Sequence, residues 1–265
     1  MTVTRICSAL LLAIILVLSV VAPAAAQKNR NAAVRIVMCE WVPYTTATLP
    51  DSGALAEIAK IALQLQGLEA QFTIVPWARA VSMMQQGETD ALLPVYMSGN
   101  NLKRYHLSES VLDVDSVFMR LKEVEIPYTT PQNLQGWRIG TVQHTSYKKN
   151  LADLGIFLVE EVPHEIQNYR KLVAGRIDMM LDTRETLERM LDSLPAEERH
   201  EVVFMDPPLH TKSLHMAFAP TSRGRQLRNI FNEGMNAVRS KGVYDAVLDK
   251  HDVVRSTGTA VRQLD

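Results

Sequence analysis

Cysteine is scarce in this sequence, which contains only Cys7 and Cys39. Cys7 lies in an N-terminal segment that we expect to be removed, so one cysteine would remain and no internal disulfide could form. Cys39 ends an apolar stretch and is typical of a small core residue. Paired His or Cys spacing is also missing, and His144 alone does not make a metal site. The sequence therefore predicts no disulfide, no metal and no other cofactor.

An excess of positive charge is missing as well. The chain has 28 Lys and Arg against 29 Asp and Glu, a formal net charge of −1. Removal of residues 1–26 would take away one basic residue, Arg5, and the balance of 27 − 29 would become −2. Binding to nucleic acid requires a basic face. We therefore expect no nucleic-acid partner.

Long apolar runs are absent except near the N-terminus, where Ala9–Val21 is apolar apart from Ser19. A membrane-spanning helix needs about 20 apolar residues, so the run is short for an uncleaved anchor, which is the alternative. Arg5 precedes the run, and small residues ending at Ala26 follow Pro23, a pattern typical of a cleavage site. We predict a signal peptide over residues 1–26, cleaved near Ala26, and a soluble, exported remainder.

The apolar periodicity that follows predicts an alternation of strands and helices in two successive copies. The expected strands cover residues 34–38, 72–75, 91–95, 138–142, 156–160 and 177–181. The expected helices cover residues 55–65, 76–86 and 147–154, with a further one ending at Gly175. Such alternation indicates parallel strands joined by helical crossovers, and hence an α/β fold.

One junction recurs in both halves, because Gly87 and Gly175 are each followed three residues later by Asp, at Asp90 and Asp178. Glycine suits a helix end because that position calls for a left-handed residue. We expect the two Asp residues to hold turns rather than to act in function. Two later amphipathic segments, 227–231 and 244–248, predict helices that pack back on a lobe formed earlier in the chain.

Five segments, in this order along the chain, carry a resemblance to a known family. They are Glu40-Trp41-Val42-Pro43-Tyr44, Pro76-Trp77-Ala78-Arg79-Ala80, Gly87 to Asp90, Leu134 to Gly140, and Leu172 to Asp178. Together they resemble the family 3 bacterial extracellular solute-binding proteins, of the polar amino-acid type. Ser108-Glu109-Ser110 is similar to the Phe-Ser-Asp-Pro stretch of that family, with Leu107 in the Phe place.

The resemblance implies a two-lobed periplasmic binding protein of type II, in which each lobe is a mixed sheet flanked by helices. Residues 27–114 and 211–265 would form lobe 1, and residues 115–210 would form lobe 2. A two-segment hinge would join them, near residues 113–115 and 209–215, and a small solute would bind in the cleft between them. The implied protein is a periplasmic monomer that delivers its solute to an ABC transporter permease in the inner membrane.

The charged groups with which this family holds an α-amino acid are absent or displaced here. The arginine that binds the ligand carboxylate corresponds to Asn101, and Arg104, three residues later, is either its substitute or a solvated surface residue. The aspartate that binds the ligand ammonium corresponds to Thr183, with Asp182 one position earlier. A shift by one residue after a strand changes the direction of a side chain. Amino-acid specificity therefore does not follow from the resemblance.

Further candidates for ligand binding follow the predicted strands of lobe 1. Trp41 and Tyr44 come after the first strand, and Tyr96 comes after the third, at the carboxyl ends where open α/β sheets bind ligands. Trp77 would stack against a ligand or, alternatively, lie in the core. Arg79 would bind an anion or, alternatively, be an exposed helix residue.

In lobe 2, Thr145 and Ser146 precede the helix expected from Tyr147. Free N–H groups and hydroxyls at a helix start favour an anion, although these side chains also suit the commoner role of a helix cap. We expect solute binding without catalysis. The alternatives are a ligand-sensing module for a receptor, and a cleft enzyme of dehydratase type with Glu40 or Asp182 as the general acid.

Overall fold

The computed structural model describes residues 33–143, 145–254 and 256. The expected signal peptide and His144 lie outside these residues. No helix of the described part is long and apolar enough to cross a membrane.

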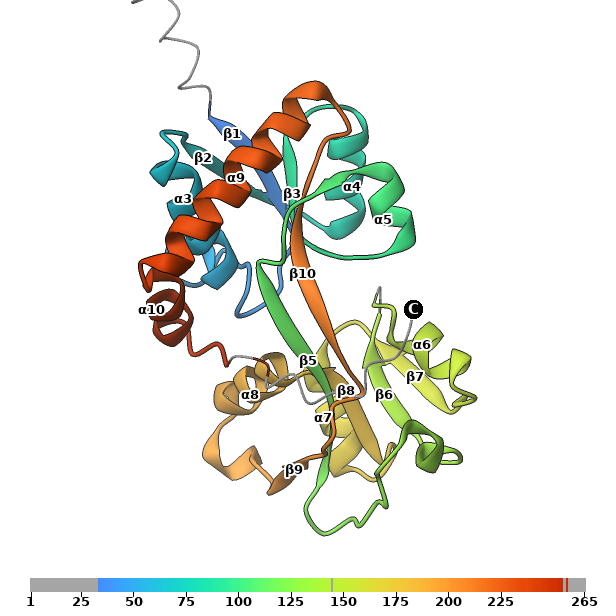
Figure 1. Cartoon of the computed structure of the whole chain (residues 1–265). Helices are drawn as coiled ribbons and strands as arrows, with labels where there is room; N and C mark the ends of the chain where they lie inside the picture. Colours follow the sequence, from blue (N-terminus) through green and yellow to red (C-terminus); the bar gives the residue numbers. More distant parts are fainter. Residues whose placement is uncertain (1–32, 144, 255, 257–265) are drawn as a thin grey trace, which may run out of the picture.

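Lobe 1 is built on three parallel strands with helices on both faces (Figure 1). Its elements are β1 (Val34–Met38), the 3-10 helix η1 (Pro50–Ser52), α3 (Ala54–Leu65), β2 (Ala70–Ile74), α4 (Trp77–Gln85), β3 (Ala91–Tyr96), α5 (Gly99–Arg104) and β4 (His106–Leu107). The central strand β1 pairs with both β2 and β3. The predicted parallel strands with helical crossovers are therefore confirmed for this half of the chain.

Lobe 2 repeats the scheme. Its elements are η2 (Pro131–Leu134), β6 (Ile139–Val142), α6 (Tyr147–Asp153), β7 (Val159–Val162), α7 (Glu165–Val173), β8 (Met179–Thr183), α8 (Arg184–Ser193), η3 (Ala196–Glu198) and β9 (Val202–Phe204). Strand β6 pairs in parallel with β7 and β8. The carboxyl ends of β6 and β8 and those of β1 and β3 come near the junction of the two lobes (Figure 1).

Two long strands, β5 (Leu112–Leu121) and β10 (His210–Phe218), run between the lobes as neighbours (Figure 1). They pair antiparallel, with His210 opposite Ser116 and Leu214 opposite Leu112. The predicted pair of crossing segments is thus a hydrogen-bonded ribbon. Through this ribbon the described strands form one sheet, in the order β2-β1-β3-β10-β5-β8-β6-β7, with β4 paired to β10 and β9 paired to β5 off this path.

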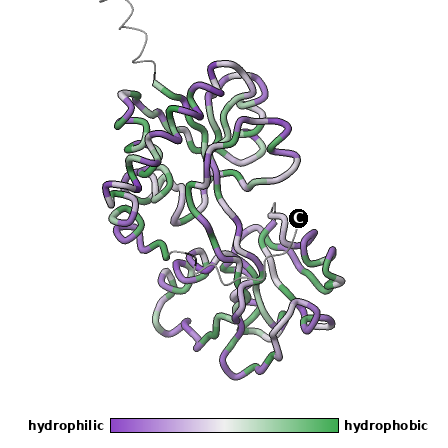
Figure 2. Tube along the Cα trace, viewed as in Figure 1, coloured by the Kyte–Doolittle hydropathy of each residue, from purple (hydrophilic) through white to green (hydrophobic). Residues whose placement is uncertain are grey.

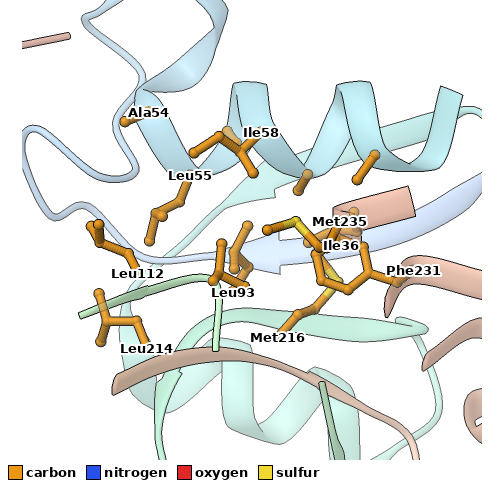
Figure 3. Packing of buried hydrophobic residues seen from close by; sticks show 14 of the residues in the cluster. Ile36, Ala54, Leu55, Ile58, Leu93, Leu112, Leu214, Met216, Phe231 and Met235 are labelled. Atoms are coloured by element: carbon orange, nitrogen blue, oxygen red, sulfur yellow. The ribbon is translucent and has the colours of Figure 1, made fainter. Parts of the chain in front are cut away.

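The last two helices, α9 (Ser222–Ser240) and α10 (Val243–Lys250), cover lobe 1, as the amphipathic pattern predicts (Figure 1). Phe231 and Met235 of α9 pack with Leu55 and Ile58 of α3 over the sheet residue Leu93 (Figure 3). Hydrophilic positions alternate with hydrophobic ones along these covering helices, which places one face of each toward the core (Figure 2).

The buried hydrophobic residues fall into clusters that separate along the chain. Two clusters use residues from Val34 to Val114 together with residues from Leu214 onward, and two others use residues from Val117 to Leu209. A separate core for each part is what defines a lobe. The boundaries after residues 26, 114 and 210 remain a proposal, with which this division of the core is compatible.

The recurring Gly-x-x-Asp junctions hold equivalent positions in the two lobes. Asp90 accepts hydrogen bonds from the backbone N–H of Arg35 at 3.0 Å and from its guanidinium, and Asp178 does the same for Arg138, at 2.7 Å from the backbone N–H. Each Asp thereby ties the strand that follows it to the first strand of its lobe. Both Asp residues thus have a structural role, but their bonds join two strands that are distant in the sequence and do not hold a local turn as predicted.

Two predicted strands begin two or three residues later than the apolar pattern suggests. Residues 156–160 and 177–181 were the expected ranges, whereas β7 and β8 start at Val159 and Met179. Ile156 directly follows the left-handed Gly155, and Ile177 follows the left-handed Gly175 by two residues; both are buried. A hydrophobic residue just after such a glycine belongs to the helix-terminating motif, which explains the shift at Ile156.

Candidate functional site

The two lobes touch each other directly through Tyr44 and Glu185. The Tyr44 hydroxyl donates a 2.7 Å hydrogen bond to Glu185 Oε2, and both side chains are buried. Beside them, the Thr186 hydroxyl donates to the carbonyl oxygen of Val42 at 3.2 Å. Tyr44 and Val42 come from the loop after β1, and Glu185 and Thr186 come from the first turn of α8. The structure therefore shows the lobes in contact on this side of the hinge.

The loop after β1 is folded so that it presents aromatic rings. Trp41 and Thr45 form an isolated bridge, and the Tyr44 N–H donates to the Trp41 carbonyl oxygen at 2.8 Å. Trp41 meets Tyr44 edge to face with 5.0 Å between ring centroids, and it lies 5.8 Å from the ring of Tyr96 at the end of β3. Three of the predicted ligand-binding residues are thus brought together in lobe 1.

Glu40, one of the two acids considered for a dehydratase, is used by the same loop. Its carboxylate accepts hydrogen bonds from the Thr46 hydroxyl and from the Ala47 N–H. Since Glu40 is exposed and already holds the turn, its environment favours a structural role.

Asp182 is the principal charged group that lobe 2 contributes. It lies near the carboxyl end of β8 with 6% of its surface exposed, and its Oδ1 accepts a 2.7 Å hydrogen bond from the Thr183 N–H. Burial, together with a smaller effect of the nearby Glu165 carboxylate, raises the pKa of the Asp182 carboxyl to about 7. Thr183 is also buried, but its hydroxyl is engaged with Thr186 at 2.8 Å.

Two tyrosines face Asp182 from opposite lobes, Tyr96 from lobe 1 and Tyr147 from lobe 2. Burial raises the pKa of both phenols, and the Asp182 carboxylate raises each of them further. The Tyr147 hydroxyl lies 3.1 Å from Ser116 Oγ on the hinge strand β5. Asp182 therefore lies near a group from each lobe.

The hinge strand β10 contributes His210 and Lys212. The His210 ring lies 6.1 Å from that of Tyr147, and burial together with the Lys212 charge lowers the pKa of His210 to about 3. Lys212 Nζ lies 5.9 Å from the centre of the Tyr96 ring, within reach of a cation–π contact.

Tyr147, Glu185 and Lys212 were not predicted. Tyr147 directly follows Thr145 and Ser146, which were candidates, and Glu185 follows Asp182 by three residues. The sequence signal that was available for Glu185 is its position three residues after Asp182, at the start of the helix that follows the strand. No sequence periodicity indicates Lys212, because its place in the site depends on the position of the hinge strand β10 between the lobes.

Two other predicted residues, Trp77 and Arg79, are exposed at the start of α4, and Trp77 has 39% of its surface exposed. The alternative that Trp77 belongs to the core is therefore wrong. Arg79 is an exposed helix residue, as its alternative stated. Ligand binding by either residue stays a prediction.

The side chains considered for binding a carboxylate or another anion of the ligand are either hydrogen-bonded to the backbone or exposed. The Asn101 amide donates a 2.8 Å hydrogen bond to the Tyr96 carbonyl oxygen, so it holds the loop after β3. Arg104 is exposed at the end of α5. In lobe 2, Thr145 donates through its hydroxyl to the Val142 carbonyl oxygen at 2.7 Å, and Ser146 is exposed. Thr145 also accepts a long bond from the Tyr147 N–H, which agrees with a local cap.

The described residues contain no group of three His, Cys, Asp or Glu side chains that could hold a metal. Cys39 is a free, half-buried thiol whose pKa is raised by burial. What the arrangement offers is a set of carboxyl groups, phenol hydroxyls and aromatic faces from both lobes, which suits the binding of a small polar molecule.

Comparison with solved structures gives the same fold throughout. A histidine kinase sensor domain with similarity to periplasmic binding proteins superposes with a TM-score of 0.73 at 16% identity, covering 86% of this chain and 99% of its own. The arginine-, lysine-, histidine-binding protein ArtJ from Geobacillus stearothermophilus gives 0.67 at 14% identity, covering 85% and 97%. An ancestral amino acid-binding protein, AncCDT-1, a precursor of cyclohexadienyl dehydratase, gives 0.67 at 15%, covering 84% and 96%.

No sequence among the curated proteins matches this chain. A family model does match, over residues 36–252, and its description is bacterial extracellular solute-binding proteins, family 3. The match spans both lobes and the hinge strands between them. The chain therefore belongs to the family 3 bacterial extracellular solute-binding proteins.

Proposed function

We propose that the protein is a periplasmic binding protein that captures a small polar or amino-acid-like solute between its lobes and presents it to an ABC permease in the inner membrane. The observation that carries the proposal is the convergence of Tyr96, Tyr147 and Asp182, from both lobes, on one place beside the Tyr44–Glu185 contact. Family membership supports it, since the family consists of solute-binding proteins. The signal peptide over residues 1–26 is part of the proposal.

In this proposal the solute stabilises the closed arrangement of the lobes. Closure about a hinge is how periplasmic binding proteins enclose their ligands. A solute that contacts both lobes binds the closed form more tightly than the open one and therefore shifts the population toward it. Trp41 and Tyr96 would supply flat apolar faces, and Asp182 would accept hydrogen bonds from a donor on the solute. Trp77, Arg79, Thr145 and Ser146 would contact its outer parts.

A sensing role is the second candidate, because a histidine kinase sensor domain shares the fold. Closure would then be read by a receptor rather than by a permease. Catalysis is the third candidate, because Asp182 has a pKa close to neutrality, as suits a general acid, and because a precursor of a dehydratase shares the fold. We propose binding without chemical change as the function.

A thermal-shift screen tests the proposal. The purified protein would be heated with amino acids, polyamines, small organic acids and aromatic acids in turn. A ligand at one hundred times its dissociation constant stabilises the fold by about 2.7 kcal/mol, which is easily measured. We expect at least one solute to stabilise the protein and to be recovered unchanged by mass spectrometry. Consumption of the solute would favour the enzyme, and silence across all classes would contradict solute binding.

A further inference from the structure

The site between the lobes contains two buried carboxyl groups that have no cationic partner among the described residues. Asp182 and Glu185 are 6% and 4% exposed, and neither forms an ion pair there. The hydrogen bond to Asp182 Oδ1 comes from the backbone, and the described residues supply no hydrogen bond to its Oδ2. A buried carboxylate is costly unless a cation pairs with it or a proton neutralises it. A cation that arrives from outside the chain would pair with Asp182 in place of that proton.

Aromatic rings on the lobe 1 side give an independent indication of the same kind of ligand. The centroid of the Trp41 ring lies 5.0 Å from that of Tyr44 and 5.8 Å from that of Tyr96. The faces of such rings attract ammonium and guanidinium groups. The ring of Tyr96 already lies 5.9 Å from one ammonium group, that of Lys212. Of these rings, that of Tyr96 lies near enough to Asp182 for the carboxylate to raise its pKa. Aromatic rings near a buried carboxyl group are a suitable environment for an organic cation.

A carboxylate on the ligand would find less support. Asn101 uses its amide on the Tyr96 carbonyl oxygen, and Arg79 and Arg104 are exposed on the surface. Thr145 donates its hydroxyl hydrogen to the backbone of its own loop. Lys212 is the cation that a carboxylate would meet in this part of the site, so the experiment includes a variant of it.

We propose that the solute is an organic amine or guanidine that carries no carboxylate, with its cationic group bound by Asp182 and by the aromatic faces of Trp41 and Tyr96. This proposal rests on the solute-binding function proposed above and names the class of solute. The positive charge of the ligand would lie beside the buried carboxyl group of Asp182. Glu185 would serve the contact between the lobes through its hydrogen bond with Tyr44.

Matched pairs of compounds that differ only by a carboxylate test this directly. Cadaverine would be compared with lysine, putrescine with ornithine, and agmatine with arginine, by isothermal titration calorimetry on the purified protein. We expect at least one amine to bind at least tenfold more tightly than its amino acid. We also expect Asp182→Asn to weaken that binding at least tenfold, whereas Asp153→Asn, at an exposed residue of α6, leaves it unchanged.

The variant Lys212→Met distinguishes a site that binds an amine from a site that binds the carboxylate of an amino acid through Lys212. We expect the amine to bind this variant as tightly as the parent or more tightly, because a nearby positive charge is removed. Tighter binding of the amino acids than of the amines, or loss of amine binding in Lys212→Met, would overturn the proposal while leaving solute binding intact. If acids, sugars and amino acids also fail to bind, the proposed function fails together with it.

Discussion

Tyr44 and Glu185 stand 141 residues apart in the sequence, yet the Tyr44 hydroxyl donates a 2.7 Å hydrogen bond to the Glu185 carboxyl group across the junction of the two lobes. Both side chains are buried, and burial raises the pKa of Glu185 as well as that of Tyr44. A contact of this kind exists only while the lobes are closed. It therefore contributes free energy to closure rather than to the folding of either lobe.

We expect Tyr44→Phe to shift the protein toward an open form. The change removes the donor and leaves the Glu185 carboxyl group without its partner, at a cost of about 1–3 kcal/mol. Small-angle X-ray scattering without added solute should show a larger radius of gyration than for the parent protein. Tyr169→Phe is the control, because the Tyr169 hydroxyl donates to the Glu198 carbonyl oxygen within lobe 2. Equal expansion in both variants would contradict a specific role in closure.

We expect Asp182→Asn to stabilise the fold at pH 8 and to change its stability little at pH 4. The pKa of Asp182 is raised from its usual 3.8 to about 7, so the folded protein holds a proton that the unfolded chain releases. Stability from this group is present below pH 3.8 and is lost as pH rises toward 7, by up to about 4 kcal/mol. Urea denaturation of both proteins across this range measures the difference.

His210 changes the stability with pH in the opposite direction to Asp182. For this reason the experiment compares the free energies of unfolding of the two proteins at each pH. Its pKa is lowered to about 3, so stability is lost as pH falls from 6.5 toward 3. Both proteins share this loss, which cancels on subtraction. Glu165, Tyr96 and Tyr147 also face Asp182 and are likewise present in both. A difference in stability that does not change with pH would contradict the raised pKa.

We expect Asp90→Ala and Asp178→Ala to destabilise the protein to a similar extent, by about 1–3 kcal/mol each. Each change leaves a backbone N–H and a guanidinium without their acceptor, at Arg35 and Arg138 respectively. Chemical denaturation measures the loss. Asp153→Ala, which breaks only an exposed pair with Lys149, should stay within about 0.5 kcal/mol of the parent. An unchanged free energy of unfolding in Asp178→Ala would show that the repeated Gly-x-x-Asp junction does not stabilise the fold.

We expect Gly234→Ala to destabilise lobe 1 by about 1–3 kcal/mol, because an added methyl group overpacks the contact of α9 with α3. A Cβ at Gly234 would meet the backbone carbonyl of Ala62, which cannot move aside without displacing α3. Thermal denaturation measures the effect. Gly99→Ala, at a helical glycine with open space around its Cβ position, is the control and should retain the parent stability.

The sequence predicted the order of the elements well, because the first strand, the crossover helices and the C-terminal helices follow from local periodicity. Trp41, Tyr44 and Tyr96 were candidates because each follows a predicted strand, and Asp182 was one because it lies one position before the place of the aspartate of the family. Tyr147, Glu185 and Lys212 could not be found in this way. Their place in the site depends on how one lobe closes on the other, and no local pattern records that.

The ribbon of β5 and β10 has a consequence for how the molecule loses its structure. Because β10 pairs with β3 and β5 pairs with β8, the backbone ladder continues from one lobe into the other. Melting either lobe alone would leave a bare strand edge on its neighbour, and an unpaired backbone group is costly when it is buried. We expect one cooperative transition on heating, with calorimetric and van't Hoff enthalpies equal, although the protein has two cores.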